Sequence, residues 1–344
     1  MRKNILNYTE NELKEELLTL GEPAYRAKQI FKGIYSSGWK QFSEFTTITK
    51  SFRNQLAEKF IINNINEIIS IQSKLDGTTK FLWELSDKNR IESVIIYEGK
   101  RVTFCISSQV GCALDCKFCA TGKMGIIRNL IPGEIIEQVL LMKEKSNFPP
   151  TNIVFMGMGE PMLNYESVMQ AADILSDPEG LCFSRKRITI STSGIIKYIY
   201  RMADENRPYS LAISLNSVNQ ETRKKIMPIS RKYPIDKLIE AAKYYTEKTG
   251  KRVTFEYVLI KNINSTLEDA KKLIELTRGI PCKINVIPCN SDDPDYRPPS
   301  WKEVEQFDRY VNKSNRTITV RNRKGWEIKA ACGQLYTANE THTA

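Results

Sequence analysis

The sequence contains a single histidine among 344 residues, His342, which lies close to the end of the chain. Polar chain ends are commonly mobile, so this imidazole is a poor candidate for a fixed catalytic position. The scarcity of histidine excludes Ser-His-Asp and Cys-His catalysis, HExxH zinc chemistry and three-histidine metal sites. The chemistry must therefore rely on cysteine, a carboxylate, lysine or a cofactor.

Long apolar runs are missing as well. No stretch approaches the roughly eighteen apolar residues of a membrane span, and residues 1–20 lack the apolar core of a secretory signal. We therefore expect a cytoplasmic protein with no membrane partner and with reduced thiols. The sequence also has no Walker A motif and no G-x-G-x-x-G that opens a helix, which excludes the usual nucleotide-binding signatures.

Positive charge is in excess, with 51 Lys and Arg against 40 Asp and Glu and a net charge of +11. This balance favours a polyanionic partner, nucleic acid first, although a merely basic surface would give the same count. Many basic residues gather in short clusters that suit phosphate contacts, at residues 185–187, 223–225, 231–232 and 321–324.

The hydrophobic pattern divides the chain into parts. The pattern predicts helices over residues 7–60, with a capping box at Thr9 and Glu12. It predicts a small antiparallel meander over residues 65–98. From residue 102 strands alternate with helices, which is typical of a parallel α/β sheet, closed or partly closed. We predict an α/β fold in four parts: a helical accessory domain at 1–62, a β meander linker at 63–100, the α/β core at 101–334 and a flexible tail at 335–344.

The strongest motif is Cys112-Ala-Leu-Asp-Cys116-Lys-Phe-Cys119, directly after the first predicted strand of the core. Three thiolates within eight residues can hold a metal centre, and no histidine is available to complete a Cys₃His zinc site. A [4Fe–4S] cluster on three cysteines leaves one iron open for another ligand. A structural zinc site with a distant fourth cysteine is the alternative.

Two further motifs fall at loops of the same core. Gly-Met-Gly-Glu-Pro at 157–161 follows a strand, and its glycines allow a ligand to approach the backbone while Glu160 can accept from an ammonium group. Ala-Ala-Cys-Gly-Gln-Leu at 330–335 places Cys332 near several cations, which should lower the pKa of its thiol. Cys332 is therefore a candidate nucleophile.

The cysteine spacing, with Phe118 before the last cysteine, resembles the radical S-adenosylmethionine (SAM) superfamily, whose fold is a partial (β/α)6 barrel. Further sequence segments, along nearly the whole chain, resemble those of the RlmN-type adenine-C2 methyltransferases. The matching segments are FCISSQVGCALDCKFCATG, FMGMGEPMLN, ITISTSGI and AACGQL, together with GEPAYRAKQIFKGIY near the N-terminus.

This resemblance implies a role for individual residues. Cys112, Cys116 and Cys119 match the ligands of the [4Fe-4S] cluster. The positions that match SAM contacts are Gly159, Glu160, Ser191, Ser214, Leu215, Asn216 and Asn290. Cys332 matches the cysteine that carries an S-methyl group, Glu92 the proton acceptor, and Cys105 the resolving thiol that forms a transient disulfide with Cys332.

The implied reaction consumes two SAM molecules per turnover. The first methylates Cys332, and the second gives a 5′-deoxyadenosyl radical that takes hydrogen from that methyl group before it adds to C2 of an adenine. A radical is needed because C2 of adenine is not a nucleophile. The implied partners are 23S rRNA, tRNA and an external electron donor of the flavodoxin or ferredoxin type, with the enzyme acting as a monomer.

Three positions depart from the family pattern: Asn216 replaces the usual histidine, Glu327 an aspartate, and Cys289 an aromatic residue beside Asn290. The remaining cysteines, Cys182 and Cys282, match no family position and are interpreted as packing residues. Two other functions stay open. One is Cfr-type methylation of C8 of the rRNA adenosine that RlmN-type enzymes methylate at C2; Pro161 favours the C2 type. The other is a zinc-containing, non-catalytic RNA-binding protein.

Overall fold

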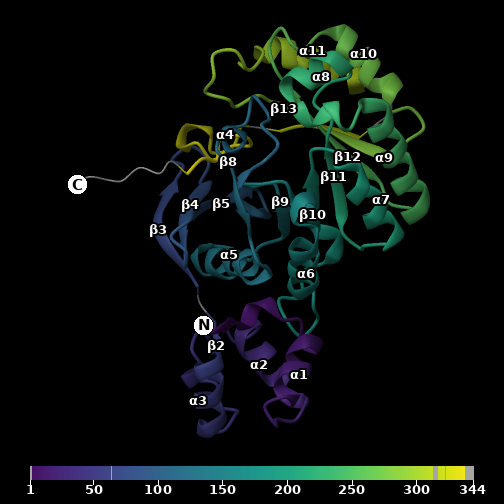
Figure 1. The fold of residues 1–344 in the computed structure, drawn as a ribbon. Coiled ribbons are helices and arrows are strands. Elements are labelled where there is room, and N and C mark those ends of the chain that lie inside the picture. Colours follow the sequence, from purple (N-terminus) through teal and green to yellow (C-terminus); the bar gives the residue numbers. More distant parts are fainter. Residues whose placement is uncertain (1, 63, 313–316, 322, 338–344) are drawn as a thin grey trace.

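The N-terminal part is a small helical domain in the computed structural model, which describes residues 2–62, 64–312, 317–321 and 323–337. It comprises α1 (Glu10–Leu18), α2 (Tyr25–Tyr35) and α3 (Lys50–Lys59). The predicted capping box is present, since the Thr9 N–H donates to the Glu12 carboxylate at 2.8 Å and the Thr9 hydroxyl accepts from the Glu12 N–H. Figure 1 shows this domain at the foot of the molecule, beneath α5 and α6.

The predicted meander is present, but it is not a separate linker. Strands β3 (Ile65–Gln72), β4 (Thr79–Leu85) and β5 (Arg90–Glu98) pair antiparallel in sequence order. A two-residue turn, Gly99 and Lys100, then leads β5 into β6 (Arg101–Cys105), which is the first strand of the core. The meander therefore extends the core sheet, whose order is β14-β13-β12-β11-β10-β9-β6-β5-β4-β3.

The core is an open parallel barrel, as predicted. The strands after β6 are β9 (Asn152–Phe155), β10 (Ile188–Thr192), β11 (Ser210–Ser214), β12 (Val253–Leu259), β13 (Cys282–Pro288) and β14 (Thr317–Val320). The main helices between them are α5 (Pro132–Lys145), α6 (Tyr165–Leu175), α7 (Ile196–Asp204), α8 (Gln220–Ile226), α9 (Ile235–Thr249), α10 (Leu267–Leu276) and α11 (Trp301–Asn312). Within the described residues β14 pairs only with β13 and β3 only with β4, so the sheet does not close on itself.

Apolar side chains in register hold the sheet to its helices. Ile213, Phe255 and Ile284 are opposite one another on β11, β12 and β13, and each is fully buried. Burial of a side chain of this size contributes about 1.5–3 kcal/mol. Such rows fix the register, and therefore fix where each strand ends and its loop begins.

One buried carboxylate joins the exit of the helical domain to the core. Glu137 of α5 is almost fully buried, and its Oε1 accepts the N–H groups of Asn64 at 2.7 Å and Ile65 at 3.0 Å. Its other oxygen, Oε2, is buried without a hydrogen-bond partner. Burial raises the pKa of Glu137 to about 8.

A hairpin that the sequence pattern did not predict frames the cysteine loop. Strands β7 (Gln109–Cys112) and β8 (Gly125–Asn129) pair antiparallel, and the short helix α4 (Ala120–Lys123) lies between them. In the part of the chain that the structure describes, no helix has both the length and the apolar character needed to cross a membrane.

Candidate active site

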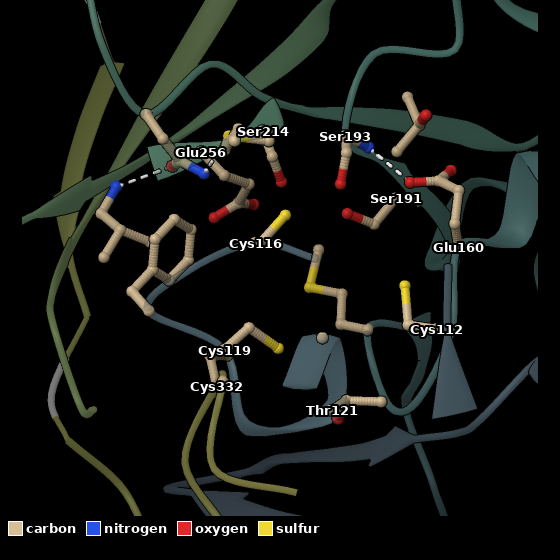
Figure 2. Close-up of a pocket in the computed structure, with 18 of the residues that line it drawn as sticks. Cys112, Cys116, Cys119, Thr121, Glu160, Ser191, Ser193, Ser214, Glu256 and Cys332 are labelled. Carbon is tan, nitrogen blue, oxygen red and sulfur yellow. Dashed lines mark hydrogen bonds between the residues drawn. The ribbon is translucent and has the colours of Figure 1, made fainter. Parts of the chain in front are cut away.

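A cavity of about 150 Å³ opens at the carboxyl ends of the parallel strands, where sites form in folds of this type. Its walls come from the cysteine loop, from the loops after β9, β10, β11 and β13, and from the C-terminal segment around Cys332. Figure 2 shows the sulfur atoms of Cys112, Cys116 and Cys119 directed into the same space, with Glu256 and the serine hydroxyls around it. The volume is many times that needed for one water, so the cavity can hold a ligand.

The three cysteines of the motif line this cavity from one loop. Cys112 ends β7, while Cys116 and Cys119 follow in the turn before α4. The loop is pinned at both sides, because the Lys117 N–H donates to the carbonyl of Ile226 and the Ala120 N–H donates to that of Gly333. Burial raises the pKa of the Cys112 thiol to about 12 and also raises the pKa values of the other two, so a bound cation is needed to keep them as thiolates.

The kinds of donor around the cavity indicate which metal centre fits it. Among the described residues three motif cysteines line the cavity and no histidine does. A cluster of several irons takes one thiolate per iron, so three separated thiols around one cavity fit a [4Fe-4S] cluster.

The Gly-Met-Gly-Glu-Pro loop forms another part of the cavity wall. Gly159 has a φ of +98°, and a Cβ there would lie 2.6 Å from Cβ of Gln109, so only glycine fits. Glu160 is buried, and its carboxylate accepts the N–H groups of Ser193 at 2.7 Å and Met162 at 3.1 Å. Burial raises the pKa of Glu160, and these N–H donors oppose that rise.

Most of the predicted SAM contacts meet at this cavity. Its lining includes Gly159, Glu160, Ser191, Ser214, Asn216 and Asn290, whereas Leu215 is buried outside it. Asn216, which replaces the family histidine, has a φ of +56°, a conformation that asparagine tolerates. Its Oδ1 accepts the Val258 N–H at 2.9 Å and its Nδ2 lies 3.3 Å from the Met227 sulfur, so this amide serves the protein's own packing.

Cys332 and Cys105 come from distant parts of the sequence to neighbouring positions. Cys332 lines the cavity, and the Asn290 amide donates to its carbonyl at 3.4 Å. Cys105 ends β6 behind the cavity wall; burial raises the pKa of its thiol to about 12, and negative charge on Cys332 would raise it further. The expected lowering of the Cys332 pKa is wrong, because burial raises it more than Arg321 lowers it.

Glu92 lies on β5 and contacts the C-terminal segment rather than the cavity itself. It is buried, with Lys80 Nζ 2.8 Å from its Oε1 and with the Tyr336 N–H donating to its Oε2 at 2.8 Å. Burial raises its pKa, and Lys80 counteracts that effect. Glu92 is therefore not an ordinary exposed strand carboxylate. It is bonded to Tyr336, which follows Cys332 by four residues in the sequence.

The same contact corrects the tail prediction. Leu335 is buried and its carbonyl accepts from the Thr121 hydroxyl at 2.6 Å, while Tyr336 is bound to Glu92. Leu335 and Tyr336 are therefore not part of a free tail, because their backbone groups are bonded to the core. The rest of the predicted tail, 338–344, lies outside the described residues and includes His342.

One charged side chain of the site, Glu256, was missed by sequence reasoning, whereas Arg321 was expected as a cation near Cys332. Glu256 of β12 lines the cavity; its Oε1 accepts from Asn285 at 2.9 Å and its Oε2 is buried without a partner. The Arg321 guanidinium lies 3.7 Å from Glu256, and this carboxylate raises the pKa of Arg321. A lone carboxylate within the apolar strand sequence VTFEYVL is a signal that could have identified Glu256.

Arg223 overturns part of the predicted RNA-binding surface. Its side chain is fully buried, and its guanidinium donates to the carbonyls of Leu215 at 2.8 Å, Ser193 at 2.8 Å and Ser214 at 3.0 Å. Burial lowers its pKa to about 10. Arg223 thus holds two cavity loops together and is unavailable to phosphate, whereas the clusters at 185–187 and 231–232 are exposed as expected.

The remaining cysteines divide between core and surface. Cys282 is buried at the start of β13, in keeping with a packing role, and Cys289 is buried in the cavity wall. Cys182 is exposed, so its interpretation as a packing residue is wrong. It falls in the irregular segment between α6 and β10, where no strand or helix pattern marks a buried face.

The chain matches known proteins over almost its entire length. The radical SAM superfamily profile matches residues 106–277, and that of the ribosomal RNA large subunit methyltransferase N-terminal domain matches residues 3–62. A probable dual-specificity RNA methyltransferase RlmN from Alkaliphilus oremlandii is 44% identical over 96% of this chain and 97% of its own length. The dual-specificity RNA methyltransferase RlmN of Geotalea uraniireducens is 40% identical over 96% of each.

A solved structure agrees with these sequence relatives. The crystal structure of a radical SAM methyltransferase from Sphaerobacter thermophilus has a TM-score of 0.92 and 39% identity, covering 97% of this chain and 99% of that one. The open barrel and the helical domain thus share their arrangement with that protein over nearly the whole of both chains. This chain belongs to the RlmN family of RNA methyltransferases within the radical SAM superfamily.

Proposed function

We propose that this enzyme methylates C2 of an adenosine at the peptidyl-transferase centre of 23S rRNA and of the adenosine 3′ to the anticodon in tRNAs. The observation that carries this proposal is that Cys332 lines the three-thiol cavity, with Cys105 close enough to feel its charge and Glu92 bonded to Tyr336 of the same C-terminal segment. A simple methyl transfer would need none of these three groups. A reaction that passes through a covalent protein–RNA adduct needs a carrier, a proton acceptor and a resolving thiol.

The cavity residues divide into two sets under this proposal. Cys112, Cys116 and Cys119 would hold the [4Fe-4S] cluster, and the loops that carry Glu160 and Asn290 would hold SAM. When bound, cluster and SAM supply the 5′-deoxyadenosyl radical that activates a methyl group. Two SAM molecules are needed per turnover, because one donates the methyl group and the other is cleaved.

The chain's own residues carry the remaining steps. The Cys332 sulfur first becomes an S-methyl thioether, and the activated carbon then bonds to C2 of the adenine. Glu92 accepts the proton that leaves C2, for which its burial and raised pKa suit it. The unpaired electron of the adduct would pass back to the metal centre that the three cysteines would hold, which leaves a closed-shell thioether between Cys332 and the adenine. The Cys105 thiolate next attacks the Cys332 sulfur; the carbon–sulfur bond breaks, the released carbon takes a proton, and a Cys105–Cys332 disulfide forms.

Arg321 is placed to assist the thiol chemistry. Its positive charge interacts with the thiols of both Cys105 and Cys332, and its guanidinium is paired with the Glu256 carboxylate. A fixed guanidinium favours the thiolate form that attacks SAM or the adduct. Exposed basic clusters would bind the RNA backbone, and an external flavodoxin- or ferredoxin-type donor would supply electrons to a monomeric enzyme in the cytoplasm.

Nucleoside mass spectrometry tests this function directly. The enzyme is reconstituted anaerobically with iron and sulfide and incubated with SAM, a reductant and protein-free rRNA from a methylation-deficient host. The RNA is then digested, with tRNA from the same host treated in parallel. We expect 2-methyladenosine. Formation of 8-methyladenosine instead would assign the chain to the Cfr type. If neither methyladenosine forms although SAM is cleaved, both proposed RNA substrates are refuted.

A matched pair of variants assigns the methyl carrier. Cys332→Ala should still cleave SAM but form no methyladenosine, whereas Cys182→Ala, which removes an exposed cysteine, should behave like the wild type. Methylation by Cys332→Ala would remove this residue from the reaction.

A further inference from the structure

An exposed tryptophan stands close to the Cys332 segment and has no part in the chemistry described above. Trp326 is 45% exposed and begins a short 3-10 turn at Trp326–Ile328. This turn lies six residues before Cys332 in the same C-terminal segment. Exposure of a large apolar ring to solvent is unfavourable, so a ring in this position near the cavity is a candidate contact for a binding partner.

The turn that carries Trp326 is rigidly fixed. Left-handed residues bound it, Gly325 with a φ of +64° and Lys329 with a φ of +54°, and the Ala330 N–H donates to the Gly325 carbonyl at 2.9 Å. A Cβ at Gly325 would lie 2.7 Å from a side-chain carbon of Thr78, so the turn packs tightly on the β3–β4 connection.

Two hydrogen bonds fasten the turn to that connection. The Gly325 N–H donates to the Asp76 carboxylate at 2.9 Å, and the Ser73 hydroxyl donates to the Glu327 carboxylate. The Trp326 backbone is therefore held from both sides. A ring on such a support loses little conformational entropy when a partner packs on it.

Side-chain contacts connect the ring to the cavity. The Arg323 guanidinium lies over the Trp326 ring, 5.1 Å from its centroid, and Arg323 Nε donates to Asn290 Oδ1 at 2.8 Å. Asn290 lines the cavity and bonds the carbonyl of Cys332. The indole is thus two contacts away from the cavity wall, backed by a cation and still exposed.

This combination fits an unstacked nucleobase better than a protein side chain. Planar aromatic rings beside Arg and Lys are the usual platforms for single-stranded bases, since every base has a π face and a neighbouring phosphate. Within four positions of Trp326 the chain provides three cations, Arg323, Lys324 and Lys329. A target adenosine that enters the cavity must leave its stack, so the neighbouring nucleotide needs a new stacking partner.

We propose that Trp326 is a base-stacking residue that receives a nucleobase next to the target adenosine. This inference rests on the proposed RNA substrate and adds a specificity-determining contact to it. Its ring replaces the stacking energy that the RNA loses when the target base enters the cavity.

The test compares Trp326→Ala with Trp326→Phe in the reconstituted holoenzyme, using a transcript of the peptidyl-transferase region of 23S rRNA. We expect Trp326→Ala to raise KM for the transcript by about 5- to 150-fold, the usual effect of removing a stacked aromatic. The kcat at saturating RNA and the KM for SAM should change less than twofold. Trp326→Phe should restore most of the RNA affinity.

Trp301 supplies the matched control, because it is also exposed but begins α11 on the outer side of the barrel (Figure 1). Trp301→Ala should leave the KM for RNA unchanged. Intrinsic fluorescence gives a second readout: RNA should quench a component that Trp326→Phe lacks and Trp301→Phe retains. This titration needs no turnover, so it remains informative if the wild type forms no methyladenosine.

Three outcomes would overturn the inference. One is an unchanged KM and an unchanged quench in Trp326→Ala. Another is a fall in kcat without a change in KM, which would mean that the ring merely supports the Cys332 segment. The third is a shift in oligomeric state on substitution, which would make Trp326 a protein contact.

Discussion

Replacement of Glu137 by glutamine should stabilise the protein at alkaline pH and destabilise it at acidic pH. Burial raises the pKa of this carboxyl from 4.5 to about 8, although its Oε1 accepts two backbone N–H groups. The folded state therefore retains a proton that the unfolded chain releases between these two values. The stabilising contribution is complete below pH 4.5 and is lost progressively as the pH rises through 8.

The magnitude follows from the size of that shift. A pKa difference of this size corresponds to about 5 kcal/mol between acidic and alkaline conditions. Glutamine keeps the Oε1 acceptor but places an NH₂ where the buried Oε2 has no partner, at a constant cost of about 1–3 kcal/mol. Glu137→Gln should therefore be less stable than the wild type near pH 4 and more stable by about 2–4 kcal/mol near pH 9.

Urea unfolding from pH 4 to pH 9 measures this difference, provided that the two proteins have equal m-values. Glu144→Gln is the control, because Glu144 lies on the same helix with a side chain that is 41% exposed. An exposed pair of this kind contributes about 0–1 kcal/mol, so the control should follow the wild type. A difference between Glu137→Gln and the wild type that does not vary with pH would refute the reasoning.

Three further substitutions test the site. Cys105→Ala should accumulate a covalent protein–RNA adduct, visible as a band that survives denaturing gel electrophoresis, and multiple turnovers without adduct would remove its resolving role. Arg223→Lys should leave at least two buried carbonyls unpaired at about 1–3 kcal/mol each, and thermal unfolding at an unchanged temperature would contradict this. Gly159→Ala should raise the KM for SAM at least tenfold, because its methyl group would overlap Gln109; normal SAM cleavage would show that the loop can shift.

Local sequence patterns predicted most of the helices and strands and the position of the cysteine motif, but not the β7–β8 hairpin around it. The capping box at Thr9 and the alternation of strands and helices after residue 102 report on neighbours in the chain, which is what such patterns record. Parallel strand order then placed the glycine loop and the serines at one edge of the sheet. These parts of the site follow from the topology alone.

Charged groups inside the protein were harder to predict, because their surroundings come from distant segments. The sequence indicates that Arg223 is part of a basic surface cluster, yet its guanidinium points inward to four carbonyls that only the folded loops bring together. Likewise, the pKa of Cys332 depends on how deeply its segment is buried, and sequence shows only the cations beside it. The hydrogen bond from the Tyr336 N–H to Glu92 joins residues that are 244 positions apart, and a periodic sequence pattern does not predict such a contact.

The two-residue turn at Gly99 and Lys100 acts as a spacer for chemistry at the other end of its hairpin. Cys105 pairs with Val94 across β5 and β6, and Glu92 lies two residues further along β5, so the two side chains with proposed roles leave the same face of the sheet. One residue inserted into this turn, if absorbed by a slip of β6, would rotate Cys105 to the opposite face. Loop length at a surface hairpin is thus as strictly constrained as the identity of the cysteine, and insertions tolerated elsewhere on the surface should be absent from this turn in active enzymes.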